Sequence, residues 1–169
     1  EAAGFVLQDV TNNIGCIARD SVVELAGSLV FLSPDGIRPV AGTDKIGDVE
    51  LSLVSPTIQN TIKNVTDAYD LNFLNSVVIR SKTQFRYFIS DNTVADSESY
   101  GIIGCYRSYT ENPHWEFGEL LGFHTNCAWS GYNDSGFEVI YHGGYDGRVY
   151  IHDIGSTLDG ADITSIYRS

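Results

Sequence analysis

The chain has 169 residues, and its 22 acidic residues against ten basic ones give a formal net charge of −12. A surface of this sign repels nucleic-acid phosphates and anionic membranes, so tight binding to either is not expected. Hydrophobic residues make up 43% and charged residues 19%, which suits one folded domain with a core. Ten Tyr, eight Phe and 17 Gly favour strands joined by tight turns.

Neither a membrane span nor a secretion signal is predicted. No stretch approaches 18 apolar residues, and residues 1–9 lack a basic start followed by an apolar run. Cys16, Cys105 and Cys127 have no CxxC spacing, so we expect buried, reduced thiols rather than disulfides or zinc ligands. Because the chain has no Met and its residues 163–169 alternate like a strand, we expect it to be part of a longer protein.

The first predicted unit covers residues 14–68. Apolar and β-branched runs predict strands at 21–25 and 28–32. Turn residues follow each strand, at 26–27 and at 33–36. An acidic connector follows at 44–50. Ser55, Pro56 and the apolar spacing after them predict a short helix at 56–65, with Ser55 as its cap.

Two further units are predicted, at 69–122 and 123–169. Strand-like runs in the second unit lie at 76–80, 84–89, 102–107 and 114–120, and in the third at 122–130, 137–141 and 148–153. Asp35, Asp91 and Asp146 lie at the turns of the three units, 56 and 55 residues apart. This period predicts an all-β, propeller-like array of antiparallel four-stranded units, and a β-sandwich is the structural alternative.

The residues singled out at turns have a structural explanation. Asp accepts hydrogen bonds from its own turn backbone, and Gly adopts positive φ at low cost. The predicted turn residues are Asp35, Gly36, Asp91, Asp146, Gly147, Asp159 and Gly160. Calcium binding at 133–136 or 159–162 is the alternative, but neither segment has the ligands of an EF-hand loop.

Catalytic, cofactor and metal sites are not predicted. The sequence has no HExxH, GxSxG, GxGxxG or P-loop motif. His142 and His152, together with Asp146 and Asp153, flank the turn at 145–147, so a hairpin there would bring some of these side chains together. Five aromatic residues suggest either packing between sheets, which we favour, or a sugar-binding face: Tyr106, Tyr109, Trp115, Phe117 and Phe123.

Two segments carry a resemblance to a known family. Residues 15–25 (GCIARDSVVEL) followed by 29–37 (LVFLSPDGI) resemble the tail nozzle proteins of tailed bacteriophages, also called tail tubular protein B or packaged-DNA stabilization proteins. Residues 143–153 (GGYDGRVYIHD) and 157–163 (TLDGADI) are similar to a stretch that closes a propeller blade in that family. The similarity spans 15–46 and 115–167.

The resemblance implies a virion structural protein, assembled in the bacterial cytoplasm into the viral tail. Copies of the chain would form a ring against portal, adaptor and other tail proteins, with DNA passing nearby without tight binding and with no membrane contact. The family supplies no catalytic residues, so no enzymatic activity is expected. The alternatives are a carbohydrate-binding propeller that contacts the host surface and a propeller hydrolase.

Overall fold

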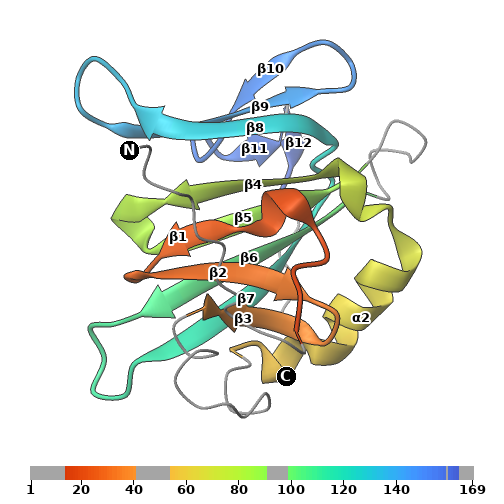
Figure 1. Ribbon diagram of the computed structural model, residues 1–169. Coiled ribbons are helices and arrows are strands. Elements are labelled where there is room, and N and C mark those ends of the chain that lie inside the picture. Colours follow the sequence, from red (N-terminus) through yellow and green to blue (C-terminus); the bar gives the residue numbers. More distant parts are fainter. Residues whose placement is uncertain (1–13, 41–53, 91–98, 159, 164–169) are drawn as a thin grey trace, which may run out of the picture.

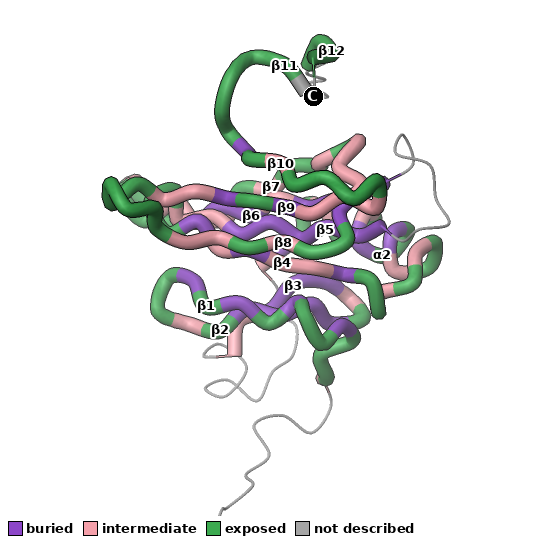
Figure 2. The backbone as a smooth tube through the Cα atoms, turned by 90° about the horizontal axis from the view of Figure 1, so that it is seen from above, coloured by how far each residue is buried: buried purple, intermediate pink, exposed green. Residues whose placement is uncertain are grey.

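The computed structural model describes residues 14–40, 54–90, 99–158 and 160–163. Within them the chain forms antiparallel sheets and one α-helix, which confirms the prediction of a mostly β protein with a short helix (Figure 1). Of the three sheets with three or four strands, the first lies beside the middle one (Figure 2), and the third packs on the opposite face of the middle sheet. None of the helices in the described ranges is long and apolar enough to cross a membrane.

The first sheet is a three-stranded meander. Its strands are β1 (Val23–Leu25), β2 (Ser28–Ser33) and β3 (Gly36–Pro39), paired in that order. Ala26 and Gly27 join β1 to β2 with φ angles of 54° and 75°. Two successive left-handed residues are what a two-residue hairpin requires, because they match the twist of the flanking strands.

The helix differs from its prediction at both ends. Pro56–Ile58 forms a 3-10 turn, and α2 follows at Gln59–Ala68, three residues longer than predicted at its C-terminal end. Ser55 does not cap the helix through its side chain. Its hydroxyl instead accepts the backbone N–H of Ile37 at 2.8 Å, so this serine ties the start of the helix to β3.

The second and third sheets follow along the chain. The middle sheet contains β4 (Leu74–Ile79), β5 (Gln84–Ile89), β6 (Tyr100–Arg107) and β7 (His114–Leu121), paired in sequence order. The third contains β8 (Thr125–Tyr132), β9 (Glu138–Gly144) and β10 (Val149–Ile151). A small hairpin, β11 (Thr157–Leu158) with β12 (Ala161–Asp162), forms a separate sheet.

The prediction of four strands in every unit is met only by the middle sheet. The first and third sheets have three strands each within the described residues. In the third unit, β10 ends at Ile151, and the chain then turns away through Asp153, whose φ is 59°. The following segment forms its own hairpin, β11 with β12, and does not add a fourth strand to the third sheet.

Two hydrophobic cores fill the spaces on either side of the middle sheet. One face of that sheet packs on the first sheet and α2, through a cluster that includes Val30, Leu32, Ile37, Ile62, Val65, Leu74, Phe85, Tyr87, Ile89 and Ile102. The opposite face packs on the third sheet through Val77, Ile79, Phe88 and Ile140. β5 contributes to both cores, and five of its six residues are buried.

Hydrogen bonds also join the layers. The Tyr87 hydroxyl donates to the carbonyl of Ser21 at 2.7 Å, which links the middle sheet to the segment before β1. On the other side, the Ser130 hydroxyl donates to the carbonyl of Val78, also at 2.7 Å. The Glu138 carboxylate accepts the backbone N–H groups of Arg80 and Ser81 at 2.8 Å each. The third sheet is thus fixed to the middle one by polar as well as apolar contacts.

The expectation of three buried thiols is wrong for two of them. All three cysteines are free, but Cys105 is buried whereas Cys16 and Cys127 are exposed. Cys127 lies on β8 beside an irregularity between residues 125 and 127, on the face of the third sheet that points away from the core. The irregularity interrupts the alternation of faces along β8, so sequence alternation alone did not show which side of the strand faces inward.

Candidate functional site

Asp35 lies in the turn between β2 and β3, where the sequence predicts it. Arg38 Nε donates to Asp35 Oδ1 at 3.1 Å, and Arg38 Nη2 pairs with the other oxygen of the same carboxylate. These bonds lower the pKa of Asp35 although partial burial opposes them, and the Ser33 hydroxyl lowers it further. The following residue, Gly36, has a φ of 148°. The turn therefore also serves as the anion partner of a buried arginine.

Asp146 occupies the corresponding turn between β9 and β10. Its Oδ2 accepts the Tyr150 hydroxyl at 2.7 Å, and its Oδ1 accepts the backbone N–H of Arg148 at 3.0 Å. Both bonds lower the pKa of Asp146. Gly147 follows with a φ of 81°.

The remaining predicted turn residues are only partly described. Gly160 lies in the turn between β11 and β12 with a φ of 85°. Asp91 and Asp159 lie outside the described residues. Asn133 holds the loop before β9 as a turn, because its side-chain oxygen accepts the N–H groups of Ser135 and Phe137 at 3.0 and 2.9 Å.

A histidine pair lies between the middle and third sheets. Nδ1 of His142, on β9, is 2.6 Å from Nε2 of His152, which follows β10. The two side chains are 7% and 6% exposed. This confirms the expectation that the strands flanking the turn at 145–147 bring the two histidines together.

The direction of the hydrogen bonds in this pair follows from its third member, Arg86. Arg86 Nη1 lies 3.2 Å from Nδ1 of His152. Because a guanidinium can only donate, Nδ1 of His152 accepts and its proton lies on Nε2. That proton is donated to Nδ1 of His142, whose own proton must then be on Nε2. The chain of donors runs from Arg86 through His152 to His142.

The surroundings keep both rings neutral. Burial lowers the pKa of His152 to about 4, and electrostatic interactions with His142 and Arg86 lower it further. Burial also lowers the pKa of His142, against an opposing influence of Asp146. A neutral His142 can accept at Nδ1, so the pKa shifts and the donor order agree.

Asp153 balances the charge of Arg86. Arg86 Nη2 donates to both carboxylate oxygens of Asp153 at 3.0 and 2.8 Å, and Lys82 Nζ donates to Oδ2 at 2.6 Å. Burial alone would raise the pKa of Asp153, but the bonds from Arg86 and Lys82 lower it below its ordinary value. Sequence reasoning did not find Arg86, whose signal is a charge between the buried aromatic residues Phe85 and Tyr87 of β5.

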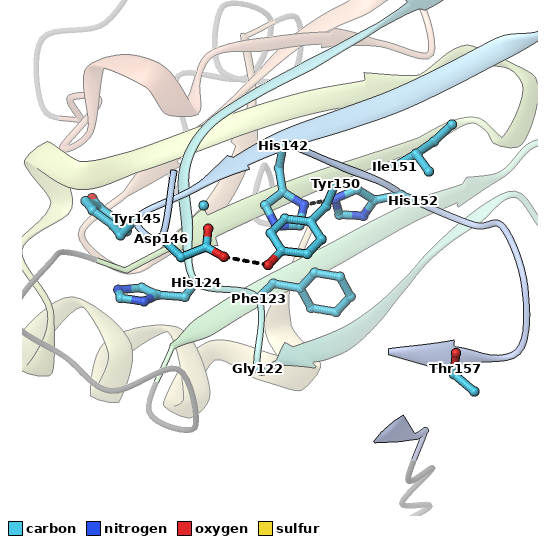
Figure 3. Close-up of a pocket in the computed structure, with 11 residues that line it drawn as sticks. Gly122, Phe123, His124, His142, Tyr145, Asp146, Tyr150, Ile151, His152 and Thr157 are labelled. Carbon is cyan, nitrogen blue, oxygen red and sulfur yellow. Dashed lines mark hydrogen bonds between the residues drawn. The ribbon is translucent and has the colours of Figure 1, made fainter. Parts of the chain in front are cut away.

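A cavity of about 280 Å³ opens beside the histidine pair (Figure 3). The Phe123 ring stacks on His152 with centroids 5.1 Å apart, and the Tyr150 ring stacks on His142 at 4.9 Å. The carboxylate of Asp146 lies at the same rim, bound to the Tyr150 hydroxyl. The cavity thus offers aromatic faces and one carboxylate acceptor.

The network of Arg86, His152, His142 and Asp153 is held together by its own hydrogen bonds. No group of three or more His, Cys, Asp or Glu side chains that could hold a metal ion occurs among the described residues. The donors and acceptors of Arg86, His152 and Asp153 are directed at one another across the two sheets. The arrangement therefore links the two layers through hydrogen bonds and an ion pair.

The favoured role of the aromatic residues, packing between sheets, is confirmed for three of the five. Trp115 and Phe117 pack against the first core, and Phe123 packs against the second. Tyr106 contacts Trp115, its neighbour across strands of the same sheet, with ring centroids 5.2 Å apart. Tyr109 differs, because it is 77% exposed.

Comparisons of the chain with protein-family models, with curated proteins and with solved structures found no match.

Proposed function

We propose that the chain is a structural segment of a bacteriophage tail, belonging to a propeller-like array in the tail nozzle. One observation carries the proposal. Three antiparallel meanders, each from one continuous stretch of chain, lie face to face, with their first strands β1, β4 and β8 in contact in that order. Neighbouring blades of a propeller are related in this way, with the first strand of each blade nearest the axis.

The resemblance of residues 15–37 and 143–163 to tail nozzle proteins supports the assignment to a viral tail. In this proposal the chain forms a ring of copies below the portal and adaptor, in the virion, with no membrane contact and no catalytic role. The two resembling stretches include the turns of Asp35 and Asp146, which both connect the second and third strands of a sheet.

Charge supports a conduit that encloses DNA without holding it. Each phosphate neutralised by Lys or Arg adds salt-dependent affinity, and this chain has ten such residues against 22 acidic ones. Several of the basic side chains are also engaged with carboxylates, including Arg38, Arg86 and Lys82. Carboxylates at a channel wall would repel duplex DNA within a Debye length of about 8 Å.

A mobility-shift assay with duplex DNA tests the conduit. The chain should cause no retardation even at low ionic strength, in a gel where a basic DNA-binding domain shifts the same duplex. A shift that weakens as salt rises would show a basic surface and would contradict this part of the proposal.

The second candidate is a carbohydrate-binding module, and the cavity beside the histidine pair favours it. Aromatic faces and a carboxylate acceptor are the groups that bind a sugar ring, and Phe123, Tyr150 and Asp146 supply them. Binding on a glycan array that is lost in Asp146→Asn and Tyr150→Phe, but kept in the exposed control Glu111→Gln, would support this candidate. An array without signal for the unaltered chain would remove it.

A further inference from the structure

The chain of hydrogen-bond donors that starts at Arg86 ends at His142. Nδ1 of His142 accepts the proton on Nε2 of His152, so the proton of the neutral His142 ring lies on its own Nε2. Within the described residues, nothing accepts a hydrogen bond from this nitrogen. In the same ranges the one buried side-chain polar atom without a partner is the hydroxyl of Tyr100, so His142 Nε2 is not sealed from solvent. It is a donor that a ligand can use.

Neighbouring rings leave one opening for this donor. Tyr150 and Phe88 stack on the His142 ring, with centroids 4.9 and 6.4 Å away. Phe123 lies nearly perpendicular to the same ring at 6.0 Å. His142 is buried apart from its place in the wall of the cavity beside the histidine pair. The open part of its ring, which includes Nε2, therefore faces the cavity.

The rim of the cavity carries an acceptor in a fixed position. Asp146 accepts the backbone N–H of Arg148 at 3.0 Å and the hydroxyl of Tyr150 at 2.7 Å (Figure 3). Gly144 leaves room for this carboxylate, because a Cβ there would lie 2.5 Å from Asp146 Oδ1. A carboxylate has about four lone-pair sites, so Asp146 can also accept a hydrogen bond from a ligand.

These two groups select the charge of a ligand. A hydroxyl group can accept from His142 or donate to Asp146, so a ligand with several hydroxyls satisfies both. An anion would lie close to the Asp146 carboxylate, and the described residues that line the cavity include no lysine or arginine. An ammonium group has only donors, so it would leave the His142 proton unpaired. The complementary ligand is neutral and polyhydroxylated.

The size of the cavity and its aromatic walls limit the ligand further. Small-molecule pockets have volumes of roughly 300–1,000 Å³, and a cavity of about 280 Å³ suits a single ring. The rings of Phe123 and Tyr150 line it and provide apolar surface for the C–H groups of a sugar.

We propose that the cavity beside the histidine pair binds one neutral pyranose ring, with His142 Nε2 donating to one sugar hydroxyl and Asp146 accepting from another. Arg86 and His152 are positioning residues in this site, because they fix which nitrogen of His142 carries the proton. The inference rests on the carbohydrate-binding candidate and is independent of the tail assignment.

NMR of the full chain with isotope-labelled histidine tests the proposal, because it shows which ring nitrogen carries the proton. At neutral pH, His142 and His152 should both carry it on Nε2. The methyl glycosides of glucose, galactose, mannose and N-acetylglucosamine are then titrated in turn. At least one should shift the Nε2–H signal of His142 until the shift saturates. Glucuronate and inorganic phosphate, as anions, should leave the signal unchanged.

Two variants test the individual contacts by titration calorimetry with the glycoside that causes the shift. His142→Phe keeps a ring in the stack but removes the donor, and Gly144→Ala displaces the Asp146 carboxylate. Each should weaken binding about tenfold, because one hydrogen bond to the sugar is lost. His114→Phe, at an exposed histidine outside the cavity, is the control and should bind as the unaltered chain. Near-ultraviolet circular dichroism checks folding, and if His142→Phe does not fold, Gly144→Ala and the NMR signal remain as tests.

The results separate this inference from the candidate on which it rests. A glycoside that binds without moving the His142 signal would overturn the inference and leave the carbohydrate candidate standing. A proton on Nδ1 of His142, no binding of any of the glycosides, or a shift caused by glucuronate or phosphate would also overturn it. The glycan array decides the wider candidate, and labelling of viral tails decides the tail assignment.

Discussion

Arg38 is 1% exposed, so the carboxylate of Asp35 supports a charge that has little access to water. Removing one partner of a buried ion pair costs far more than removing one partner of an exposed pair, because the remaining charge is left in a poorly solvated site. The Asp-Gly dipeptide predicts the turn at Asp35 from sequence. Its arginine partner could not be predicted, because that requires knowing that Arg38 points into the fold.

Asp35→Asn should therefore lower the free energy of unfolding by about 2–4 kcal/mol, measured by urea denaturation. Asp20→Asn is the matched control, because Asp20 pairs with Arg19 at 2.8 Å on the surface, where Arg19 is 88% exposed. The control should change stability by no more than about 1 kcal/mol. Equal losses in the two variants would contradict the role given to Asp35.

His152 predicts a specific dependence of stability on pH. Its pKa is about 4 in the folded chain and about 6.5 in the unfolded chain, so the unfolded state binds more protons between these values. Stability should be complete above pH 6.5 and should fall as pH drops toward 4, by roughly 3 kcal/mol in total.

Unfolding free energies at pH 7 and pH 5 test this prediction, because most of the carboxylates remain ionised over that interval. His152→Gln should show a smaller decrease than the unaltered chain, and the residual slope belongs to His142, whose pKa is also lowered. His114→Gln, at an exposed histidine, should leave the decrease unchanged. An unaltered slope in His152→Gln would exclude it as the source.

At the scale of the elements, strands and turns could be predicted because each depends on local chemistry. Alternation and turn residues predict the strands of the middle sheet to within two or three residues. The prediction of side-chain roles fails where the position of a side chain depends on contact with a distant segment of the chain. Ser55 bonds to β3 rather than capping the helix, and the irregularity in β8 sets which way Cys127 points. Both depend on contacts between segments far apart in the sequence.

Gly104 shows how closely two neighbouring strands are fitted. A Cβ at this position on β6 would lie 2.3 Å from the ring of Phe85, which is fully buried on β5. Gly104→Ala should therefore destabilise the fold by about 1–3 kcal/mol, because the ring must shift inside a packed core. The thermal unfolding midpoint reports this change.

Gly118→Ala is the control on the adjacent strand β7, where nothing lies within 4 Å of the added Cβ. Replacing a strand glycine in open space should leave stability unchanged or raise it slightly, because alanine loses less backbone entropy on folding. If the two substitutions have the same effect, the contact between Gly104 and Phe85 does not limit the packing.

At the scale of the whole molecule, the sheets follow one another in the order of the chain. They stack through their apolar faces, which form because apolar side chains alternate along the strands. Four of the six residues of β5 are apolar or aromatic and five are buried, which is typical of a strand covered on both sides. The polar bridge of Arg86, His152 and Asp153 between two layers has no such signature, since its members are 66 and 67 residues apart.

The central claim is that this chain is built into a bacteriophage tail. Gold-labelled antibodies raised against the folded chain, applied to purified particles of a tailed bacteriophage whose genome carries this sequence, test the proposal directly by electron microscopy. We expect label at the tail, below the junction with the capsid, and no label on tailless capsids. Particles without label, from a lysate in which the same antibodies detect the chain free of virions, would contradict it.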